Sequence, residues 1–207
     1  MNRLIIIAHP RADSFNYIIK DTLIQEFVRR GDKVKVRDLY EMEFKPILGI
    51  DEIMYTKENK ICPDIAVEQS YIEWADELTF IYPLWWNAFP AILKGYIDRV
   101  FTNGFAFRIT PNGPEGMLKN KTVRLITSAG MSESSLRKSG VYEGLKITQD
   151  RGVFEFCGMA VADHIYITES TSISEELKQD VLNEIVEKVN GVGVELKNIL
   201  KGEEFKG

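Results

Sequence analysis

The fold is decided by residues 83–101, which read PLWWNAFPAILKGYIDRVF. They follow the apolar run LTFIY at 78–82, which is short, rich in β-branched and aromatic residues and ends at Pro83, so it predicts a buried strand. Pro90 suits the first position of a helix, where a missing backbone N–H costs nothing. The apolar residues after it fall on one helical stripe, namely Ile92, Tyr96, Ile97, Val100 and Phe101.

The loop between this strand and this helix, residues 84–89, carries two adjacent tryptophans. In an open α/β sheet, ligands bind at loops that leave the carboxyl ends of strands. One tryptophan there would favour a hydrophobic turn packed under another loop. Two in sequence favour a platform whose ring faces and backbone amides hold a flat heteroaromatic group.

Working outward, three further apolar stretches predict strands at 4–8, 122–128 and 162–168. At 33–38, Val34 and Val36 alternate with charged residues, which predicts a less buried strand. Helical patterns lie between them at 15–30, 64–75, around 153–156 and after Ser172 or Ser174. Residues 39–63 are expected to form an excursion with little regular structure. Strands that alternate with helices predict an α/β fold, a doubly wound parallel sheet of five strands in the order 2-1-3-4-5 with helices on both faces.

Composition bounds the class of protein. The chain has 207 residues, of which 44% are hydrophobic, and predicts a single domain over 1–207 with an ordered core at 1–200 and a frayed tail at 201–207. A net charge of −5 argues against nucleic acid as a partner. The apolar run at 4–8 is too short for a signal peptide or a membrane span, so we expect a cytoplasmic protein without an integral membrane segment. The two cysteines lie far apart in sequence, and no metal site is predicted.

Three loops should meet at the carboxyl edge of the sheet, because they follow the three central strands: 9–16, 83–89 and 127–135. In the first loop, Ser14 and Asn16 stand at a helix N-terminus, where the helix dipole and free N–H groups favour an anion such as a phosphate. The alternative for Ser14 and Asn16 is an ordinary N-cap. His9 could equally be a hydrogen-bonded turn residue, and His164 is interpreted as structural.

Several catalytic signatures are absent from the sequence. It has no Walker loop, no G-x-G-x-x-G after a strand and no G-x-S-x-G elbow. A phosphate cradle beside an aromatic platform, with few ionisable groups between them, suits a flavin, whose chemistry belongs to the cofactor. The loop Thr127, Ser128, Ala129 and Gly130 could then meet the N1/O2 edge of the ring, where negative charge develops on reduction.

These motifs resemble the NAD(P)H quinone dehydrogenases of flavodoxin-like fold, the group of quinone reductases, drug-activity modulators and potassium-efflux ancillary proteins. The resemblance covers residues 4–158 and is most specific at 83–101. The residues that carry it are His9, Ser14-Phe15-Asn16-Tyr17, 38–47, 64–69, Pro83-Leu84-x-Trp86, Pro90 to Gly95, Arg99-Val100-Phe101, Phe105-Ala106 and Phe156-Cys157-Gly158.

The resemblance implies a homodimer with a flavin at each subunit interface. It also implies ping-pong transfer of a hydride from NAD(P)H through flavin N5 to a quinone or a similar small acceptor. Carried over by position, the cofactor-binding residues are His9, Ser14, Phe15, Asn16, Pro83, Leu84, Trp85, Trp86, Asn87, Thr127, Ser128, Ala129 and Gly130. Trp85 would line the substrate pocket together with Phe105 and Phe107 of the other subunit.

The chain departs from the family pattern in two places. Where mammalian members have a tyrosine and a histidine implicated in proton handling, residues 131–138 contain neither, and Tyr142 could replace the tyrosine only through a gap. The chain also lacks the long C-terminal extension that helps grip the adenylate of FAD. FAD is therefore expected narrowly ahead of FMN. The alternative function is a flavodoxin-like electron carrier or a regulatory module of a membrane transporter.

Overall fold

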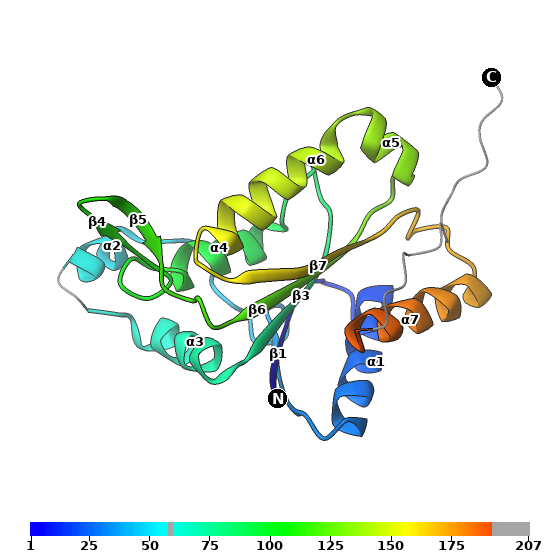
Figure 1. Ribbon diagram of the computed structural model, residues 1–207, viewed down its shortest axis with the longest axis horizontal. Coiled ribbons are helices and arrows are strands. Elements are labelled where there is room, and N and C mark those ends of the chain that lie inside the picture. Colours follow the sequence, from blue (N-terminus) through cyan, green and yellow to red (C-terminus); the bar gives the residue numbers. More distant parts are fainter. Residues whose placement is uncertain (58–59, 192–207) are drawn as a thin grey trace.

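The computed structural model describes residues 1–57 and 60–191. Five parallel strands form the central sheet in the order β2-β1-β3-β6-β7 (Figure 1). Their bounds are β1 Asn2–Ile7, β2 Lys33–Asp38, β3 Glu77–Pro83, β6 Thr122–Ser128 and β7 Ala160–Ile167. This order is the predicted 2-1-3-4-5, with the numbering shifted by a small hairpin, so the predicted fold class is confirmed.

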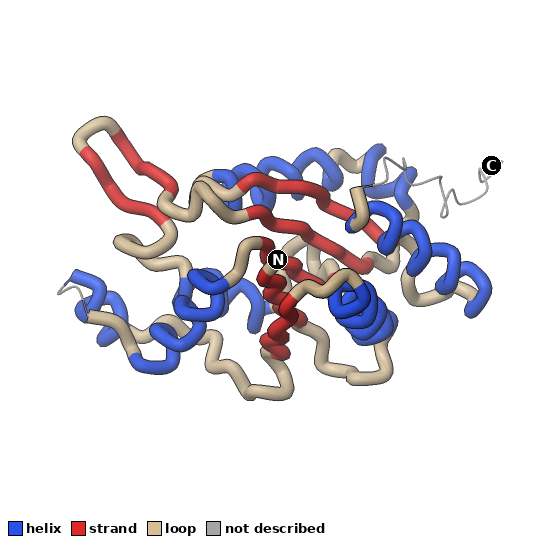
Figure 2. Tube along the Cα trace, turned by 60° about the horizontal axis from the view of Figure 1, so that its bottom comes forward, coloured by secondary structure: helices blue, strands red, loops and turns tan. Residues whose placement is uncertain are grey.

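Helices cover both faces of the sheet (Figures 1 and 2). One face packs on α1 (Phe15–Arg29) and α7 (Glu175–Val189), and its core centres on Ile5, Ile81 and Ile126. The other face packs on the remaining long elements around Leu4, Phe80 and Leu125. These elements are α3 (Pro63–Trp74), α4 (Ala91–Val100) and the π-helix η1 (Lys146–Glu155). Strands buried on both faces explain the uninterrupted apolar runs in the sequence.

The aromatic stretch folds as its sequence predicts, with one difference in detail. β3 is buried along its whole length, and α4 begins at Ala91 with Pro90 as its N-cap rather than its first residue. In α1, Ile18 and Val28 of the expected apolar stripe are exposed, because the buried face is narrower than the stripe. Ser174, not Ser172, caps α7 by accepting a hydrogen bond from the Leu177 amide.

Three regions are more regular than the sequence predicts. Residues 39–63 contain α2 (Ile50–Lys57), the aromatic turn after α4 forms the hairpin β4 (Phe107–Thr110) and β5 (Gly113–Gly116), and helices α5 (Glu133–Lys138) and α6 (Val141–Leu145) precede η1. These elements are short or polar, so their periodicity is weak in the sequence. The expected weakening of the last helix at Gly193, its extension to Ile199 and the frayed tail lie outside the described residues.

The excursion at 39–49 is held against α4 by close contact and by charge. A Cβ on Gly95 would lie 2.1 Å from the Pro46 carbonyl oxygen, so only glycine fits at this contact. Arg99 of α4 donates to the Lys45 carbonyl oxygen of the same segment at 2.7 Å and to Glu52 of α2 at 2.9 Å. Arg99 is therefore a structural anchor.

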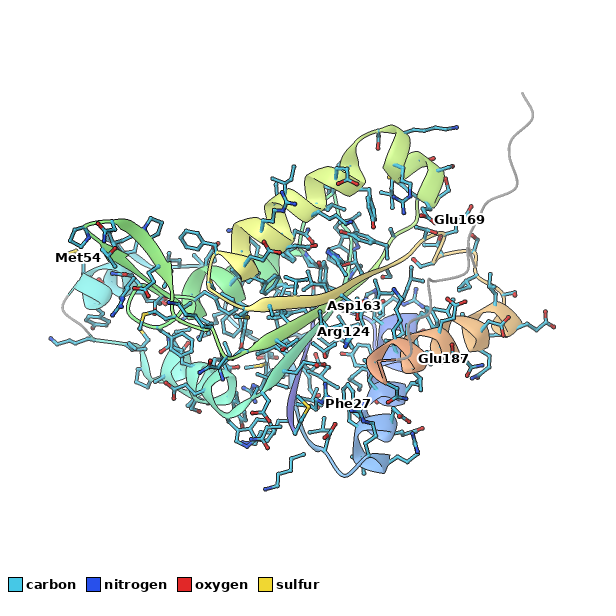
Figure 3. The ribbon with its side chains drawn as sticks, in the orientation of Figure 1. Phe27, Met54, Arg124, Asp163, Glu169 and Glu187 are labelled. Carbon is cyan, nitrogen blue, oxygen red and sulfur yellow. The ribbon has the colours of Figure 1, made fainter. Side chains whose placement is uncertain are left out.

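Buried charges cross the sheet on the face covered by α1 and α7. Arg3 of β1 pairs with Asp32 and Glu77, and Arg124 of β6 pairs with Glu77 and Asp163. Figure 3 shows Arg124 beside Asp163 in the middle of the molecule. These five residues form the ion-pair ladder, which lies toward the amino ends of the strands. Among the described helices, none is long and apolar enough to cross a membrane.

Candidate functional site

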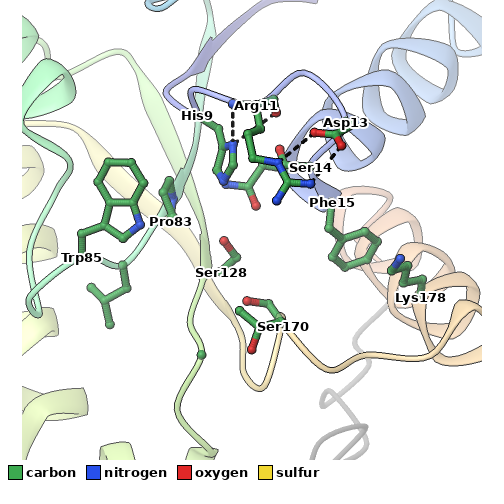
Figure 4. A pocket seen from close by; sticks show the side chains of 14 residues that line it. His9, Arg11, Asp13, Ser14, Phe15, Pro83, Trp85, Ser128, Ser170 and Lys178 are labelled. Carbon is green, nitrogen blue, oxygen red and sulfur yellow. Dashed lines mark hydrogen bonds and ion pairs between the residues drawn. The ribbon is translucent and has the colours of Figure 1, made fainter.

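A cavity of about 470 Å³ opens at the carboxyl edge of the sheet (Figure 4). The three predicted loops meet there, and a fourth segment joins them from the end of β7. The lining residues are His9, Arg11, Asp13, Ser14, Phe15, Asn16, Pro83, Leu84, Trp85, Ser128, Gly130, Ser170, Thr171 and Lys178. The structure therefore brings nine of the thirteen predicted cofactor-binding residues to one cavity.

The N-terminus of α1 presents polar groups that no protein atom satisfies. Ser14 occupies the N-cap position with extended backbone, yet its hydroxyl makes no capping hydrogen bond. The Ser14 Oγ and Asn16 Nδ2 atoms are buried and lack hydrogen-bond partners within the described residues. Because a buried unsatisfied polar group costs about 1–3 kcal/mol, such groups are expected to serve a ligand. Ser14 is thus the N-cap residue by position, but its side chain does not cap α1.

His9 closes the opposite side of this cradle. Its Nδ1 accepts a hydrogen bond from the Arg11 amide at 3.1 Å, and its ring lies 6.3 Å from the Trp85 ring. Burial lowers the pKa of His9, so the ring is neutral near pH 7. Arg11 forms an exposed ion pair with Asp13 at 2.9 Å at the mouth of the cavity (Figure 4). The cradle thus combines neutral donors with a helix N-terminus, as an anion site requires.

The two tryptophans lie on a tight turn with an uncommon backbone. Trp85 and Ala88 exchange both backbone hydrogen bonds, at 3.3 and 3.0 Å. Trp86 and Asn87 between them adopt positive φ angles of 51° and 56°, which glycine normally occupies. The amides of Trp85 and Ala88 are therefore engaged in the turn, and only those of Trp86 and Asn87 remain for a ligand. Trp86 is fully exposed.

The loop after β6 enters the cavity through only two of its four predicted residues. Ser128 and Gly130 line the cavity, whereas Thr127 and Ala129 are buried beneath it. The Ala129 amide donates to the Ile167 carbonyl oxygen at 2.8 Å, so it is not free to meet a ligand. The side chain of Thr127 instead contacts His164, with 3.0 Å between Oγ1 and Nε2.

Phe105 and Phe107 do not line the cavity of their own chain. Phe107 belongs to the β4–β5 hairpin and packs on Phe156, with ring centroids 5.3 Å apart. Figure 1 shows the hairpin at the end of the molecule opposite the α7 N-terminus. Tyr142 also lies away from the cavity lining and packs on Tyr166 at 5.0 Å. The roles predicted for these three residues stay predictions.

Sequence reasoning missed the fourth segment of the site. Ser170 donates to the Ala129 carbonyl oxygen from its amide and its hydroxyl, at 3.0 and 3.1 Å, which holds the loop after β7 against the cavity. Lys178 of α7 lines the same cavity and pairs with Glu175 at 2.5 Å. No motif marks this segment. Its only signal is its place after the fifth strand, at the same sheet edge.

Comparison with known proteins gives concordant results. The family model described as "Flavodoxin-like fold" matches residues 1–189. A Haemophilus influenzae protein named "Uncharacterized NAD(P)H oxidoreductase" is 42% identical over 77% of this chain and 79% of its own length.

The chain is also similar to "NAD(P)H dehydrogenase [quinone] 1" of Cavia porcellus, with 36% identity over 77% of this chain and 66% of that protein. The alignment thus spans just under two thirds of this relative's length. Among solved structures, the NAD(P)H:quinone oxidoreductase of Methanothermobacter marburgensis superposes with a TM-score of 0.83 at 26% identity. That match covers 93% of this chain and 98% of the other chain.

Proposed function

The chain belongs to the flavodoxin-like fold family and within it resembles the NAD(P)H:quinone oxidoreductases, and from this premise we propose that it is a flavin-dependent enzyme that reduces quinones with NAD(P)H. The observation that carries the proposal is the pair of buried, unpartnered polar atoms on Ser14 and Asn16 at the N-terminus of α1. Both residues line the cavity beside an aromatic turn.

The residues present fit a flavin phosphate. Ser14 Oγ can donate its proton and Asn16 Nδ2 can donate two, while the first amides of α1 have no partner within the helix. A phosphate would satisfy both side chains at once, and hydrogen bonds to a charged group contribute about 1.5–3 kcal/mol each. His9 stands on the other side of the same cradle. The cradle is thus incomplete without an anion.

The aromatic turn fits the ring system of the same cofactor. When bound, the flavin supplies the hydride-accepting chemistry. The protein orients the ring through the exposed amides of Trp86 and Asn87, and Trp85 excludes water from one side of the pocket. NAD(P)H and the quinone would bind one after the other at the same place beside the flavin ring, which is a ping-pong mechanism. The two hydrogen bonds between Trp85 and Ala88 hold the turn beside that place in one conformation.

The extent of the cavity favours FAD over FMN. FMN carries one phosphate, whereas FAD carries two and an adenosine. The cavity continues past the α1 cradle to Ser170, Thr171 and the Lys178 ammonium on α7. A lysine that lines the same cavity as the first cradle suits a second phosphate, so we propose FAD as the resident cofactor.

We further propose that the active form is a homodimer. Trp86 is fully exposed beside the cavity, and Phe107 lies on the hairpin remote from it. Apolar side chains are also exposed over the excursion and the hairpin, among them Ile47 at 82%, Ile50 at 70% and Ile109 at 68%. Exposed apolar surface of this kind marks an interaction site. A second copy would cover it and bring its Phe105 and Phe107 to the pocket.

The test begins with the visible spectrum of the purified protein. We expect a bound flavin that is released by heat and identified as FAD by chromatography. NADPH should bleach it, and menadione should restore the colour with steady turnover. Light scattering should give twice the mass of one chain. A protein that takes up neither flavin would contradict the proposal, and a persistent one-electron state with poor turnover would favour the electron carrier.

A further inference from the structure

A cluster of buried polar side chains lies beneath the cavity, on the opposite face of the sheet from the phosphate cradle. Its centre is His164, whose side chain is 2% exposed. The cluster comprises Tyr82, Thr127, Gln149, Asp150, His164 and Tyr166.

The hydrogen bonds of the cluster orient the imidazole ring. His164 Nδ1 lies 2.6 Å from Asp150 Oδ1, and His164 Nε2 lies 3.0 Å from Thr127 Oγ1. A carboxylate only accepts, so Nδ1 carries the proton and Nε2 is left to accept from the Thr127 hydroxyl. In this state the ring is neutral. If Nε2 also gained a proton, it would donate to the same Thr127 oxygen, and no heavy atom would need to move.

The π-helix η1 is what places the acid. Ten residues, Lys146–Glu155, are wound with i→i+5 hydrogen bonds, a geometry that is rare and frequent at functional sites. Its wider turn directs two consecutive residues, Gln149 and Asp150, toward the sheet, and both are buried. Gln149 accepts from Tyr82 at 2.7 Å, and Asp150 holds His164. The π-helical winding therefore brings both Gln149 and Asp150 into hydrogen-bond distance of the cluster.

Along the strands, the residues of the cluster directly precede residues that line the cavity. Tyr82, Thr127 and Tyr166 lie side by side in register across β3, β6 and β7. The next row holds Pro83 and Ser128, which both line the cavity. One residue along a strand is about 3.3 Å. A charge placed in the cavity is therefore close enough to act on the Thr127–His164 pair.

The groups that face His164 come from every element around it. Asp150 and Lys146 face it from η1, Tyr166 from β7, Tyr82 from β3, and Tyr142 reaches it through Tyr166. Burial lowers the pKa of His164, and Asp150 opposes this effect. The ring is accordingly neutral in the structure, and a nearby negative charge would favour its protonation.

If the proposed function is correct, the reaction consumes one proton that NAD(P)H does not supply, and His164 held by Asp150 is placed to carry it. NAD(P)H gives up a hydride, which is two electrons and one proton, whereas a quinone becomes a hydroquinone by taking two electrons and two protons. Each cycle therefore needs one further proton. We propose that His164, held by Asp150, takes up this proton from solvent when NAD(P)H delivers its two electrons and releases it, through Thr127, when the quinone takes them away. His164 is thus a positioning residue that acts through Thr127.

The experiment uses the flavin-loaded protein labelled with ¹⁵N-histidine. The chain has two histidines, so His164 is assigned by the signal that His164→Gln removes. We expect His164 to be neutral at pH 7 with the cofactor oxidised and to become an imidazolium after reduction with dithionite. If His164 titrates identically in both states, the inference is wrong. If the protein loads no flavin at all, it is the proposed function that fails.

Matched variants test the route through Thr127. Thr127→Val removes the hydroxyl but keeps the shape, and Thr127→Ser keeps the hydroxyl. We expect the valine variant to lose most of the redox-linked titration of His164 and the serine variant to retain it. Proton uptake on reduction with NADPH, whose hydride already carries one proton, followed with an indicator dye in weak buffer, should fall from near one per flavin toward zero in the valine variant. Equal responses in the two variants would overturn the role of Thr127.

Discussion

The two ends of the central strands differ in whether a buried polar side chain finds an oppositely charged partner in the protein. Toward the amino ends of the strands, the ion-pair ladder joins Arg3, Glu77, Arg124 and Asp163, and every member has an oppositely charged neighbour. At the carboxyl ends, Ser14 and Asn16 present buried atoms without protein partners. Both edges are built from the same strands.

The difference shows which edge serves stability and which serves binding. A buried charge without a partner destabilises a protein strongly, so the ladder must be complete in the folded chain. A binding site must instead leave donors for its ligand, and the protein is less stable until the ligand arrives. Substitutions at the two edges should therefore have opposite signatures, one in the free energy of unfolding and the other in ligand affinity.

The largest effect is expected from Glu77→Leu in the ladder. Glu77 lies between Arg3 and Arg124, and its loss leaves both guanidinium groups short of an acidic partner. We expect the free energy of unfolding to fall by about 3 kcal/mol, measured by urea denaturation of the flavin-free protein. Flavin affinity of the folded fraction should not change. A variant as stable as the original would contradict the assigned role of the ladder.

Asn16→Ala should show the reverse signature. The substitution removes a donor to the phosphate but also removes an unsatisfied buried group, so the flavin-free protein should keep its stability. The dissociation constant for flavin, followed by fluorescence quenching, should rise about tenfold or more, because a hydrogen bond to a charged group contributes about 1.5–3 kcal/mol. Asn183→Ala on the exposed side of α7 is the control and should leave affinity unchanged. If Asn16→Ala destabilised the flavin-free protein and left flavin affinity unchanged, the carboxyl ends of the strands would serve stability rather than binding.

A smaller effect is expected at the aromatic turn. Trp86→Gly relieves the positive φ of a residue that makes no buried contact, and should stabilise the flavin-free protein by about 0.5 kcal/mol. Trp86→Ala removes the same ring but keeps the strain, so it is the matched control. Quinone turnover should fall in both variants. Equal unfolding midpoints for the two variants would show that the turn stores no strain.

The weakest signature is expected in the pH dependence of stability. Burial lowers the folded-state pKa of His9 and of His164 below 6.5, so the stability they contribute is present above that pH and declines as pH falls below it. Burial would raise the pKa of Asp32, but hydrogen bonds from the Met1 amino group and Arg3 outweigh it and lower that pKa below 3.8.

The contribution of Asp32 is thus lost only in stronger acid. Urea titrations across pH should show two separate declines, the upper reduced by His164→Gln, since His9 still contributes, and the lower reduced by Asp32→Asn. A single decline that neither substitution changes would contradict the division between the edges.

The sequence predicts the sheet well because its three central strands are buried on both faces and their apolar runs need no context to be recognised. It also predicts three of the four loops at the cavity, since each directly follows a central strand. It cannot predict the segment at 170–178, where a serine, a threonine and a lysine carry no distinguishing pattern. Nor does it predict the π-helix, because Gln149 and Asp150 face the sheet only in that winding. For this reason His164 is interpreted from sequence as an isolated structural residue.

The contact between Gly95 and Pro46 has a consequence for the exchange of parts between relatives. Since any side chain at position 95 would collide with the Pro46 carbonyl, the excursion and α4 are not separable modules. A chimera that imports a foreign excursion must import a matching helix surface, or it will assemble with the segment displaced. The two stretches, 49 residues apart in sequence, should therefore be inherited, recombined and redesigned as one unit.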